Sequence, residues 1–405
     1  MGLVILSEFS TPPGYGVYNR HHELCRHLVA DNQECTVVVS SYHHFLQKDY
    51  PENKSYQDFV ENGVRTVVIK TLRYKNALSK WRLINWFIFS LRIFLYQSKI
   101  IKNGDLLVVS SPSPINVFFA LFRKIFFGNK FVFEIRDVWP LTLIELGNYS
   151  RWHPLILLLS LCEYLGYSAS ERIVSTLPYA NERVKSLLGK RKFNFTCIPQ
   201  GYNPEMFENP DPLSVRYEEK YLRDARFTIC YAGTLGLSNA LDPIIKASKK
   251  LEFALPQVVF LFVGEGALKA KYMEETNSQN NVIFAPAVKK AQVQSLLKYA
   301  DVVYDSVHDT PLYSYGLSRN KWIDYLFAGK PLLFSGPKKG ITMINEERCG
   351  FTVPPSDPDG LVDKILEIAS IDHQELAKIG ERGKAYVMLE RTYEALAKEF
   401  SDKVL

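Results

Sequence analysis

Long apolar runs are missing from this sequence. Its most apolar stretches, around residues 83–91 and 152–162, reach only about half of the ~20 residues that a helix needs to cross a bilayer. The start of the chain, Met1 to Glu8, lacks the basic residues and the cleavage site of a signal peptide and is typical of a first buried strand. We therefore expect no transmembrane helix and a cytoplasmic protein.

Metal-binding cysteine patterns and a strong charge excess are missing as well. The formal charge of +6 is mild for 405 residues and forms no basic stripe, which argues against a nucleic-acid-binding protein. The six cysteines show no CxxC and no Cys/His spacing typical of zinc, so we expect reduced core residues. They are Cys25, Cys35, Cys162, Cys197, Cys230 and Cys349.

The sequence does contain short apolar runs that alternate with longer helical patterns, which is typical of α/β proteins with parallel sheets. Seven strands are predicted in the first half, at 3–7, 35–41, 66–71, 105–111, 130–136, 172–176 and 195–199. Six are predicted in the second half, at 227–232, 258–263, 281–285, 301–305, 331–335 and 350–353. The chain past Asp357 is predicted to be helical to its end.

Two domains are expected, because 405 residues exceed what one hydrophobic core usually serves. We place a first doubly wound domain at residues 1–203 and a second at 204–387. Residues 388–405 are expected to form a helix that packs back towards the first domain. Ligands of doubly wound sheets bind at the carboxyl ends of the strands, so a cleft lined by these ends is the expected site.

Three turns that contain glycine follow predicted strands. Gly14 and Gly16 precede the first helix, Gly233 and Thr234 follow the first strand of the second domain, and Gly264 and Gly266 follow the next strand. Glycine lets a diphosphate approach backbone N–H groups that lack a partner. Each turn alone is equally compatible with a purely structural role, but the three together favour a phosphorylated ligand.

The segment 315–331, YGLSRNKWIDYLFAGKP, predicts a short loop through Leu317 and Ser318 that enters a helix. Lys321 and Asp324 lie three residues apart and therefore on one face of that helix. The ammonium would neutralise phosphate charge, and the carboxylate would accept hydrogen bonds from ribose hydroxyls. The alternative is a solvated ion pair on a surface helix.

Two segments of the first domain allow similar alternatives. Arg136 and Asp137 follow a buried strand and are expected to point into the cleft, unless they form a plain salt bridge that closes the strand. Residues 81–96 combine aromatic and aliphatic residues with Arg82 and Arg92. Core packing of a domain helix is the favoured interpretation there, with a membrane-surface helix as the alternative.

Four motifs together carry a family resemblance: EIRDVWP at 134–140, YAGTLG at 231–236, FVGEG at 262–266 and GLSRNKWIDYLFAGKP at 316–331. Through them the chain resembles retaining glycosyltransferases of family 4, over almost its whole length. It is especially similar to the bacterial subgroup that includes N-acetylfucosamine transferases of O-antigen and capsule synthesis. The resemblance implies the GT-B fold, two Rossmann-like domains that face each other across a cleft.

The resemblance also implies roles for single residues. Asp324 takes the place of the second acid of the family's Glu-x7-Glu motif and would bind the donor ribose, and Lys321 would contact the diphosphate. The first acid falls at Gly316, where this sequence departs from the pattern. Arg136 stands where many relatives carry a His before Asp137, and it would stabilise the leaving phosphate with Asp137 orienting it. Asp357 and Asp359 match a metal-binding DxD only superficially and are expected to cap a helix, so no metal and no cofactor are predicted.

The function predicted from this is sugar transfer from a nucleotide diphosphate sugar, with UDP favoured, to a glycan or polyprenyl-linked hydroxyl, with retained anomeric configuration, in surface polysaccharide synthesis. Lys321, Arg136 and the backbone N–H groups of residues 14–16 and 317–318 would stabilise the charge on the departing diphosphate. A peripheral contact with the inner face of the membrane fits such an acceptor. A sugar-nucleotide epimerase of the same fold and a non-catalytic binding protein are the alternatives.

Overall fold

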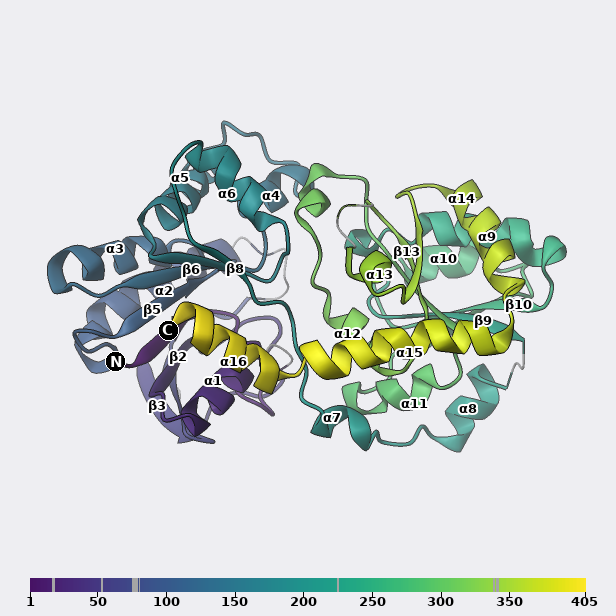
Figure 1. Cartoon of the computed structure of the whole chain (residues 1–405), viewed down its shortest axis with the longest axis horizontal. Coiled ribbons are helices and arrows are strands. Elements are labelled where there is room, and N and C mark those ends of the chain that lie inside the picture. The colour runs from purple at the N-terminus through teal and green to yellow at the C-terminus, as the bar shows by residue number, and fades with distance from the viewer. Residues whose placement is uncertain are drawn as a thin grey trace. The chain divides into compact units, whose positions relative to one another are not determined.

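The structure, a computed structural model, describes residues 1–16, 19–51, 54–74, 79, 81–223, 226–337, 339 and 342–405. The chain divides into two compact units. The first unit consists of Met1–Pro199 together with Tyr393–Leu405, and the second is the continuous segment Gln200–Thr392 (Figure 1). Each unit is an α/β structure built on a sheet that is largely or wholly parallel.

The sheet of the first unit has eight strands in the order β3-β4-β2-β1-β5-β6-β7-β8. The strands are β1 (Leu3–Leu6), β2 (Cys35–Ser40), β3 (Tyr56–Glu61), β4 (Val64–Ile69), β5 (Leu106–Ser110), β6 (Phe131–Ile135), β7 (Arg172–Ser175) and β8 (Phe195–Cys197). All neighbours pair in parallel except β3 and β4. The sequence predicted every strand but β3.

β3 was missed because it is an edge strand in which polar residues interrupt the apolar ones, so that it has no continuous buried run. A turn signal for it was nevertheless present. Asn62 and Gly63 both have positive φ angles, 52° and 76°, and join Glu61 of β3 to its partner Val64 of β4. Asn-Gly between two strands is the preferred sequence of such a two-residue hairpin.

The helices of the first unit are α1 (Arg20–Ala30), α2 (Trp81–Ile100), α3 (Asn116–Phe127), α4 (Leu141–Glu145), α5 (Pro154–Ala169), α6 (Ala180–Leu188) and α16 (Tyr393–Val404). Figure 1 shows α3 and α5 on one side of the sheet and α1 and α16 on the other. Tyr393, Leu396 and Phe400 of α16 pack with Leu24 and Leu28 of α1 in one core cluster. The last helix thus completes the core of the unit that contains the first strand.

The sheet of the second unit has six parallel strands in the order β11-β10-β9-β12-β13-β14. They are β9 (Phe227–Ala232), β10 (Val258–Val263), β11 (Val282–Ala285), β12 (Val302–Ser306), β13 (Leu332–Ser335) and β14 (Gly350–Val353). All six match predicted strands. The strand order reverses direction between β9 and β12, and in doubly wound sheets ligands bind at the carboxyl ends of the strands at such a switch point.

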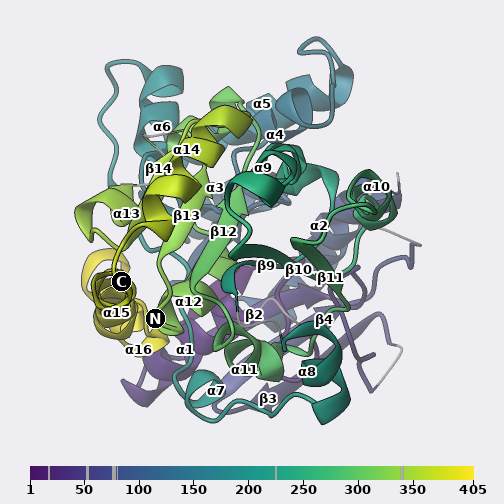
Figure 2. The same ribbon diagram turned by 90° about the vertical axis from the view of Figure 1, so that its right-hand side faces the viewer.

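The helices of the second unit cover both faces of this sheet. Figure 2 shows α9 and α14 on one side and α11 and α12 on the other. The α-helices are α7 (Glu205–Glu208), α8 (Val215–Tyr221), α9 (Asp242–Ala254), α10 (Lys269–Glu275), α11 (Val293–Leu297), α12 (Asn320–Phe327), α13 (Thr342–Glu346), α14 (Pro358–Ala369) and α15 (His373–Glu390). Short 3-10 turns are η1 (Leu237–Asn239), η2 (Lys290–Gln292) and η3 (Pro311–Tyr315).

The segment with Asp357 and Asp359 behaves as the sequence predicted. Asp357 is the N-cap of α14, and its carboxylate accepts a hydrogen bond of 2.8 Å from the backbone N–H of Gly360. Asp359 lies in the first turn of the helix and pairs with Lys250 on the surface. Both acids therefore have structural partners at a helix start.

Candidate active site

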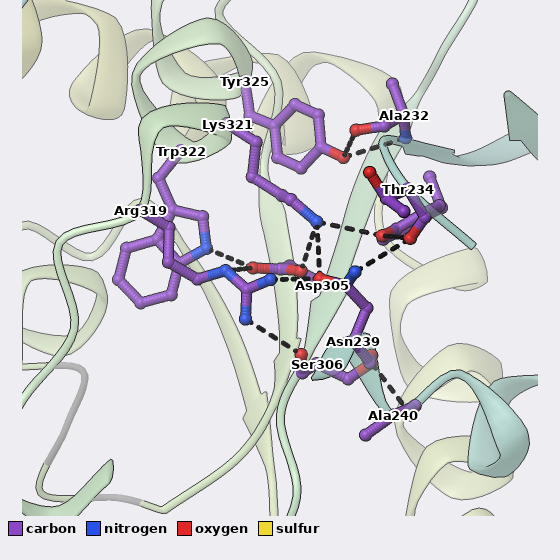
Figure 3. Close-up of polar contacts among 11 residues, drawn as sticks. Ala232, Thr234, Asn239, Ala240, Asp305, Ser306, Arg319, Lys321, Trp322 and Tyr325 are labelled. Carbon is purple, nitrogen blue, oxygen red and sulfur yellow. Dashed lines mark hydrogen bonds and ion pairs between the residues drawn. The ribbon is translucent and has the colours of Figure 1, made fainter. Parts of the chain in front are cut away.

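The candidate site lies in the second unit, at the carboxyl ends of β9 and β12 where the strand order reverses (Figure 3). β12 contributes Asp305 and Ser306, and β9 contributes Tyr231 and Ala232. α12 and the residue before it contribute Arg319, Lys321, Trp322 and Tyr325 from one side. A dense polar network thus forms at the place where a doubly wound sheet binds its ligand.

Asp305 is the centre of this network. Its carboxylate is fully buried and accepts from the Lys321 ammonium at 3.1 Å and from the Trp322 indole N–H at 2.8 Å. It also pairs with Nε of Arg319 at 2.9 Å. A buried carboxylate is costly unless its lone pairs are satisfied, and here two cations and a neutral donor satisfy them. Asp305 therefore holds the start of α12 against the sheet.

Lys321 is held by more than this ion pair. Its Nζ donates to the hydroxyl of Tyr231 at 3.0 Å and to Oδ1 of Asn239 at 3.3 Å, and it lies 4.3 Å from the centre of the Tyr231 ring. Burial lowers the pKa of Lys321 to about 8, aided by the nearby Arg319, although Asp305 opposes the shift. The ammonium is therefore fixed in position and largely buried, with 17% of the whole side chain exposed.

Asn239 and Ser306 connect the loop after β9 to the end of β12. Asn239 donates from Nδ2 to the carbonyl of Thr234 at 2.8 Å, and its Oδ1 also accepts from Arg319. Ser306 donates to the carbonyls of Asn239 and Ala240 at 2.7 and 3.1 Å. These bonds fix the loop that carries Gly233 and Thr234 beside Lys321.

A pocket of about 330 Å³ opens next to the network. Its lining residues are Ala232, Gly233, Thr234, Val263, Gly264, Glu265, Ala287, Val288, Val293, Asp324 and Tyr325. The volume lies in the range of small-molecule sites, and the lining combines apolar side chains with a few polar groups. Four residues that the sequence proposed for donor binding, Gly233, Thr234, Gly264 and Asp324, line it.

Asp324 is the acidic group of α12 in this pocket. It is nearly buried, and burial raises its pKa, while the partly exposed Lys290 pairs with it and opposes the shift. The solvated ion pair between Lys321 and Asp324, the alternative considered from the sequence, does not form, because each residue has its own partner. The two side chains share α12, with Lys321 directed into the Asp305 network and Asp324 lining the pocket.

The glycines of the second unit allow close contact between two loops. A Cβ added at Gly264 would lie 1.9 Å from the carbonyl of Gly233, and one at Gly266 would lie 2.2 Å from that of Leu235. The N–H groups of Gly233 and Gly264 donate to the carbonyls of Val263 and Ala285. These two amides are therefore engaged in the sheet and differ from the unpartnered donors that the sequence analysis expected.

In the loop before α12, the side chains of Leu317 and Ser318 have partners of their own, while the diphosphate contact was predicted for the backbone N–H groups of these residues. Leu317 packs against the core of the unit, and the hydroxyl of Ser318 accepts from the backbone N–H of Gln200 at 2.8 Å. The helix begins at Asn320, two residues after Ser318.

The candidate residues of the first unit lie after strands β1 and β6 of its sheet. Gly14 and Gly16 precede α1, which begins at Arg20. The backbone N–H groups of Arg136 and Asp137 donate to the hydroxyl of Ser111, at 2.9 and 3.2 Å, just past the ends of β6 and β5.

A buried charge cluster adjoins this strand end. Glu134 is the last acidic residue of β6 and contacts Nε2 of His21 at 2.6 Å, the hydroxyl of Ser110 at 2.6 Å and Nε of Arg20 at 3.5 Å. Burial favours a raised pKa for Glu134, but His21, Arg20 and Arg136 outweigh it and lower the pKa. Glu134 is therefore a carboxylate that orders α1 against β6.

Sequence reasoning missed Asp305, Arg319, Asn239 and Tyr231 as members of the site. A signal existed for Asp305, since this charged residue ends the apolar run Val302–Tyr304. Arg136 and Asp137 follow a predicted strand in the same way. No local pattern marks Asn239 or Tyr231, because their role depends on the loop geometry after β9. Within the described part of the chain, no group of three or more His, Cys, Asp or Glu side chains is arranged to hold a metal ion.

Comparison with known proteins adds a family match for the second unit. Residues 226–370 match the family model described as "Glycosyl transferases group 1". This match contains β9, β12, α12 and the pocket. No curated protein sequence matches the chain.

Solved structures match both units together. Sucrose-phosphate synthase from Thermosynechococcus elongatus is 15% identical with a TM-score of 0.74, covering 99% of this chain and 98% of that chain. The E. coli structure described as "Trehalose-6-phosphate" bound with UDP-2-fluoro glucose is 12% identical with a TM-score of 0.74, covering 100% and 99%. HepE from Anabaena, in complex with UDP and glucose, is 13% identical with a TM-score of 0.66, covering 99% and 98%.

These findings define the class of protein. The chain has the GT-B fold, as the sequence predicted, with two α/β units built on parallel-stranded sheets. Residues 226–370 of its second unit match the glycosyltransferase group 1 model, and the polar network and the pocket lie within the matched segment.

Proposed function

We propose that the protein is a retaining glycosyltransferase that uses a nucleotide diphosphate sugar, with UDP as the nucleotide. The observation that carries the proposal is the position of Lys321. A nearly buried ammonium, fixed by Asp305, Tyr231 and Asn239, stands at the sheet's switch point beside a nucleoside-sized pocket. The family match of residues 226–370 and the UDP-bound neighbours support this choice of donor.

The pocket suits a nucleoside in both shape and chemistry. Apolar atoms of Val263, Ala287 and Val288 offer a surface for a base. Asp324 would accept hydrogen bonds from the ribose hydroxyls once Lys290 moves aside. This arrangement leaves the diphosphate on the side of Gly233 and Lys321, because a Cβ at Gly233 would lie 3.1 Å from the Lys321 ammonium.

Catalysis would depend on charge stabilisation. Breaking the bond between sugar and phosphate leaves negative charge on the diphosphate, and a preset cation lowers the energy of that transition state without reorganising. Lys321 serves this role in the second unit, and Arg136 is proposed for it in the first. The departing phosphate oxygen would take the proton of the incoming hydroxyl, so the anomeric configuration is retained.

The acceptor side of the proposal rests on the motif resemblance to family 4 and its N-acetylfucosamine-transferase-like subgroup. We propose a glycan or polyprenyl-linked acceptor in bacterial surface polysaccharide synthesis, with the protein at the cytoplasmic face of the membrane. Asp137, exposed after β6, is proposed to orient Arg136 or the acceptor. No metal ion and no cofactor take part in this scheme.

A screen of UDP-, GDP- and TDP-sugars for thermal stabilisation tests the donor assignment. A ligand that binds only the folded state raises the melting temperature, so UDP-sugars should stabilise the wild-type protein above the others. Asp324→Ala should remove most of this shift, and Asp359→Ala, a surface acid of the same unit, should retain it. Equal stabilisation of wild type and Asp324→Ala would place the nucleotide elsewhere.

A further inference from the structure

Three helices on one side of the first sheet present apolar side chains to solvent. On α2 these residues recur every three or four positions and form a stripe along the helix: Trp81, Ile84, Phe87, Leu91, Phe94 and Leu95. α3 adds Phe118, Ile125, Phe126 and Phe127, and α5 adds Leu157, Leu161 and Tyr164. We call these exposed side chains the outer apolar face.

The outer apolar face is continuous between α2 and α3, and α5 lies next to α3. α3 contacts both α2 and α5. The ring of Phe94 on α2 lies 4.7 Å from that of Phe122 on α3, which lies 4.9 Å from that of Phe126. Contiguous apolar surface of this kind marks an interaction site, whereas single exposed apolar residues are ordinary.

Packing of the first unit does not require these side chains. The inward face of α2 supplies Trp86, Phe89 and Ile93, which are completely buried. This confirms the core-packing interpretation of residues 81–96, but it leaves the stripe on the opposite side of α2 without a partner among the residues that the structure describes. By contrast, α16 on the other side of the sheet exposes Glu394, Lys398, Asp402 and Lys403.

Basic residues outnumber acidic ones around the outer apolar face, where the exposed Glu171 after α5 pairs with Lys124 of α3 at 2.8 Å. Residues 62–133 contain twelve Lys and Arg residues and a single acid, Asp105. Asp105 is buried and accepts hydrogen bonds from the N–H groups of Gly2 and Lys102. Glu163 of α5 is also buried, and it pairs with Arg183 at 2.8 Å. The three helices, which the structure describes throughout, thus expose no carboxylate, while Lys99 at the end of α2 and Lys130 after α3 are exposed.

Apolar side chains on helices that expose no carboxylate, with the exposed Lys99 and Lys130 beside them, match the two features of an anionic lipid surface. Acyl chains and glycerol groups accept the aromatic and aliphatic side chains, and lipid phosphates attract Lys and Arg. None of the described helices combines the length and the apolar character needed to cross a bilayer. We propose that the outer apolar face of α2, α3 and α5 binds the surface of an anionic membrane.

This docking surface belongs to the first unit and is independent of the donor site in the second. It gives a physical reason for the membrane contact that an acceptor with a polyprenyl anchor would require. The face could instead join two copies of the chain, and the test below separates these occupants. A self-association surface would need no anionic lipid and would show a dependence on protein concentration.

The test is cosedimentation of the full-length protein with vesicles of phosphatidylcholine, with and without phosphatidylglycerol. The variant Leu91→Ser/Leu95→Ser/Phe126→Ser removes three side chains that are 61%, 67% and 69% exposed. Wild type should bind the anionic vesicles, and the variant should bind at least ~10-fold more weakly, because three insertable apolar groups are lost. The matched control is Phe253→Ser, which removes a phenylalanine of α9 that is 89% exposed in the second unit, and it should bind as wild type.

A tryptophan readout reports the contact directly. Trp81 lies in the stripe and is half exposed, whereas Trp86, Trp139 and Trp322 are buried. In a Trp152→Phe background, anionic vesicles should shift the emission of Trp81 to shorter wavelength and shield it from iodide. Salt should weaken the binding, because the lipid charge is screened.

Three results would overturn the proposal. They are no binding of wild type to anionic vesicles, binding by the triple variant equal to wild type, and a concentration-dependent dimer in sedimentation velocity that the triple variant abolishes. The last would assign the face to a second copy. Retained UDP-sugar stabilisation of the triple variant separates loss of docking from loss of folding or of donor binding.

Discussion

Lys321 is the residue on which the proposed chemistry most depends. If its ammonium stabilises the leaving diphosphate, Lys321→Ala should lower turnover at saturating donor by ~100-fold or more, the scale of losing one preset charge-stabilising group. Lys250→Ala, which removes a surface lysine of α9, serves as the control and should leave turnover unchanged. A Lys321→Ala enzyme with near wild-type turnover would refute the catalytic role.

The pKa of Lys321 predicts a pH dependence. Its value in the free protein is lowered to about 8, so the charged form predominates at neutral pH and is lost as the pH rises through 8. Accordingly kcat/KM for the donor should fall on the alkaline side near pH 8, since this parameter reports the free enzyme. In Lys321→Arg the guanidinium stays protonated, and any remaining activity should extend to higher pH. If kcat/KM falls at the same alkaline pH in Lys321→Arg as in wild type, a group other than Lys321 causes the pH dependence.

A substitution of Asp305 tests separately whether the polar network stabilises the folded protein. Asp305→Asn removes the buried negative charge that faces Lys321 and Arg319 and leaves both cations uncompensated. We expect a loss of about 3–5 kcal/mol in the free energy of unfolding, the usual cost of breaking a buried pair from one side. Urea unfolding measures it, with Asp359→Asn as the exposed control, where less than about 1 kcal/mol is expected. Similar losses in the two variants would mean that Asp305 is not structurally important.

At the scale of elements, most strands were predictable from the sequence. Only some residues of the candidate site were. Buried parallel strands such as β10 are recognisable in the sequence, because six buried apolar residues follow one another. The edge strand β3 has no such run, and only its Asn-Gly turn is recognisable. Lys321 and Asp324 were found because their spacing on α12 is local. Asp305, Asn239 and Tyr231 were not, because three separate segments bring them together.

The last helix illustrates the same limit. Its amphipathic pattern is readable from the sequence, but its partner α1 ends more than 360 residues earlier in the chain. Leu396→Ala in α16 removes a buried side chain from the shared cluster and should cost about 2–5 kcal/mol of stability. Lys398→Ala on the exposed side of α16 should cost little. Equal melting temperatures for wild type and Leu396→Ala would show that α16 does not support the core of the first unit.

At the scale of the whole molecule, the chain enters the second unit once and leaves it once. The second unit is the continuous segment Gln200–Thr392, while the first unit is completed only when residues 393–405 return to it. The candidate donor site, including the Asp305 network and its pocket, is built entirely within the continuous unit. The outer apolar face is built entirely within the other. Donor recognition and membrane docking are thus separable properties, each testable without the other.

A crystal structure of the protein with bound UDP tests the central claim most directly. The account predicts the base in the pocket beside Gly264 and Val288, the ribose hydroxyls on Asp324 and a phosphate oxygen within hydrogen-bonding distance of Lys321. UDP bound away from α12, or bound with Lys321 still directed only at Asp305 and the phosphates elsewhere, would contradict it.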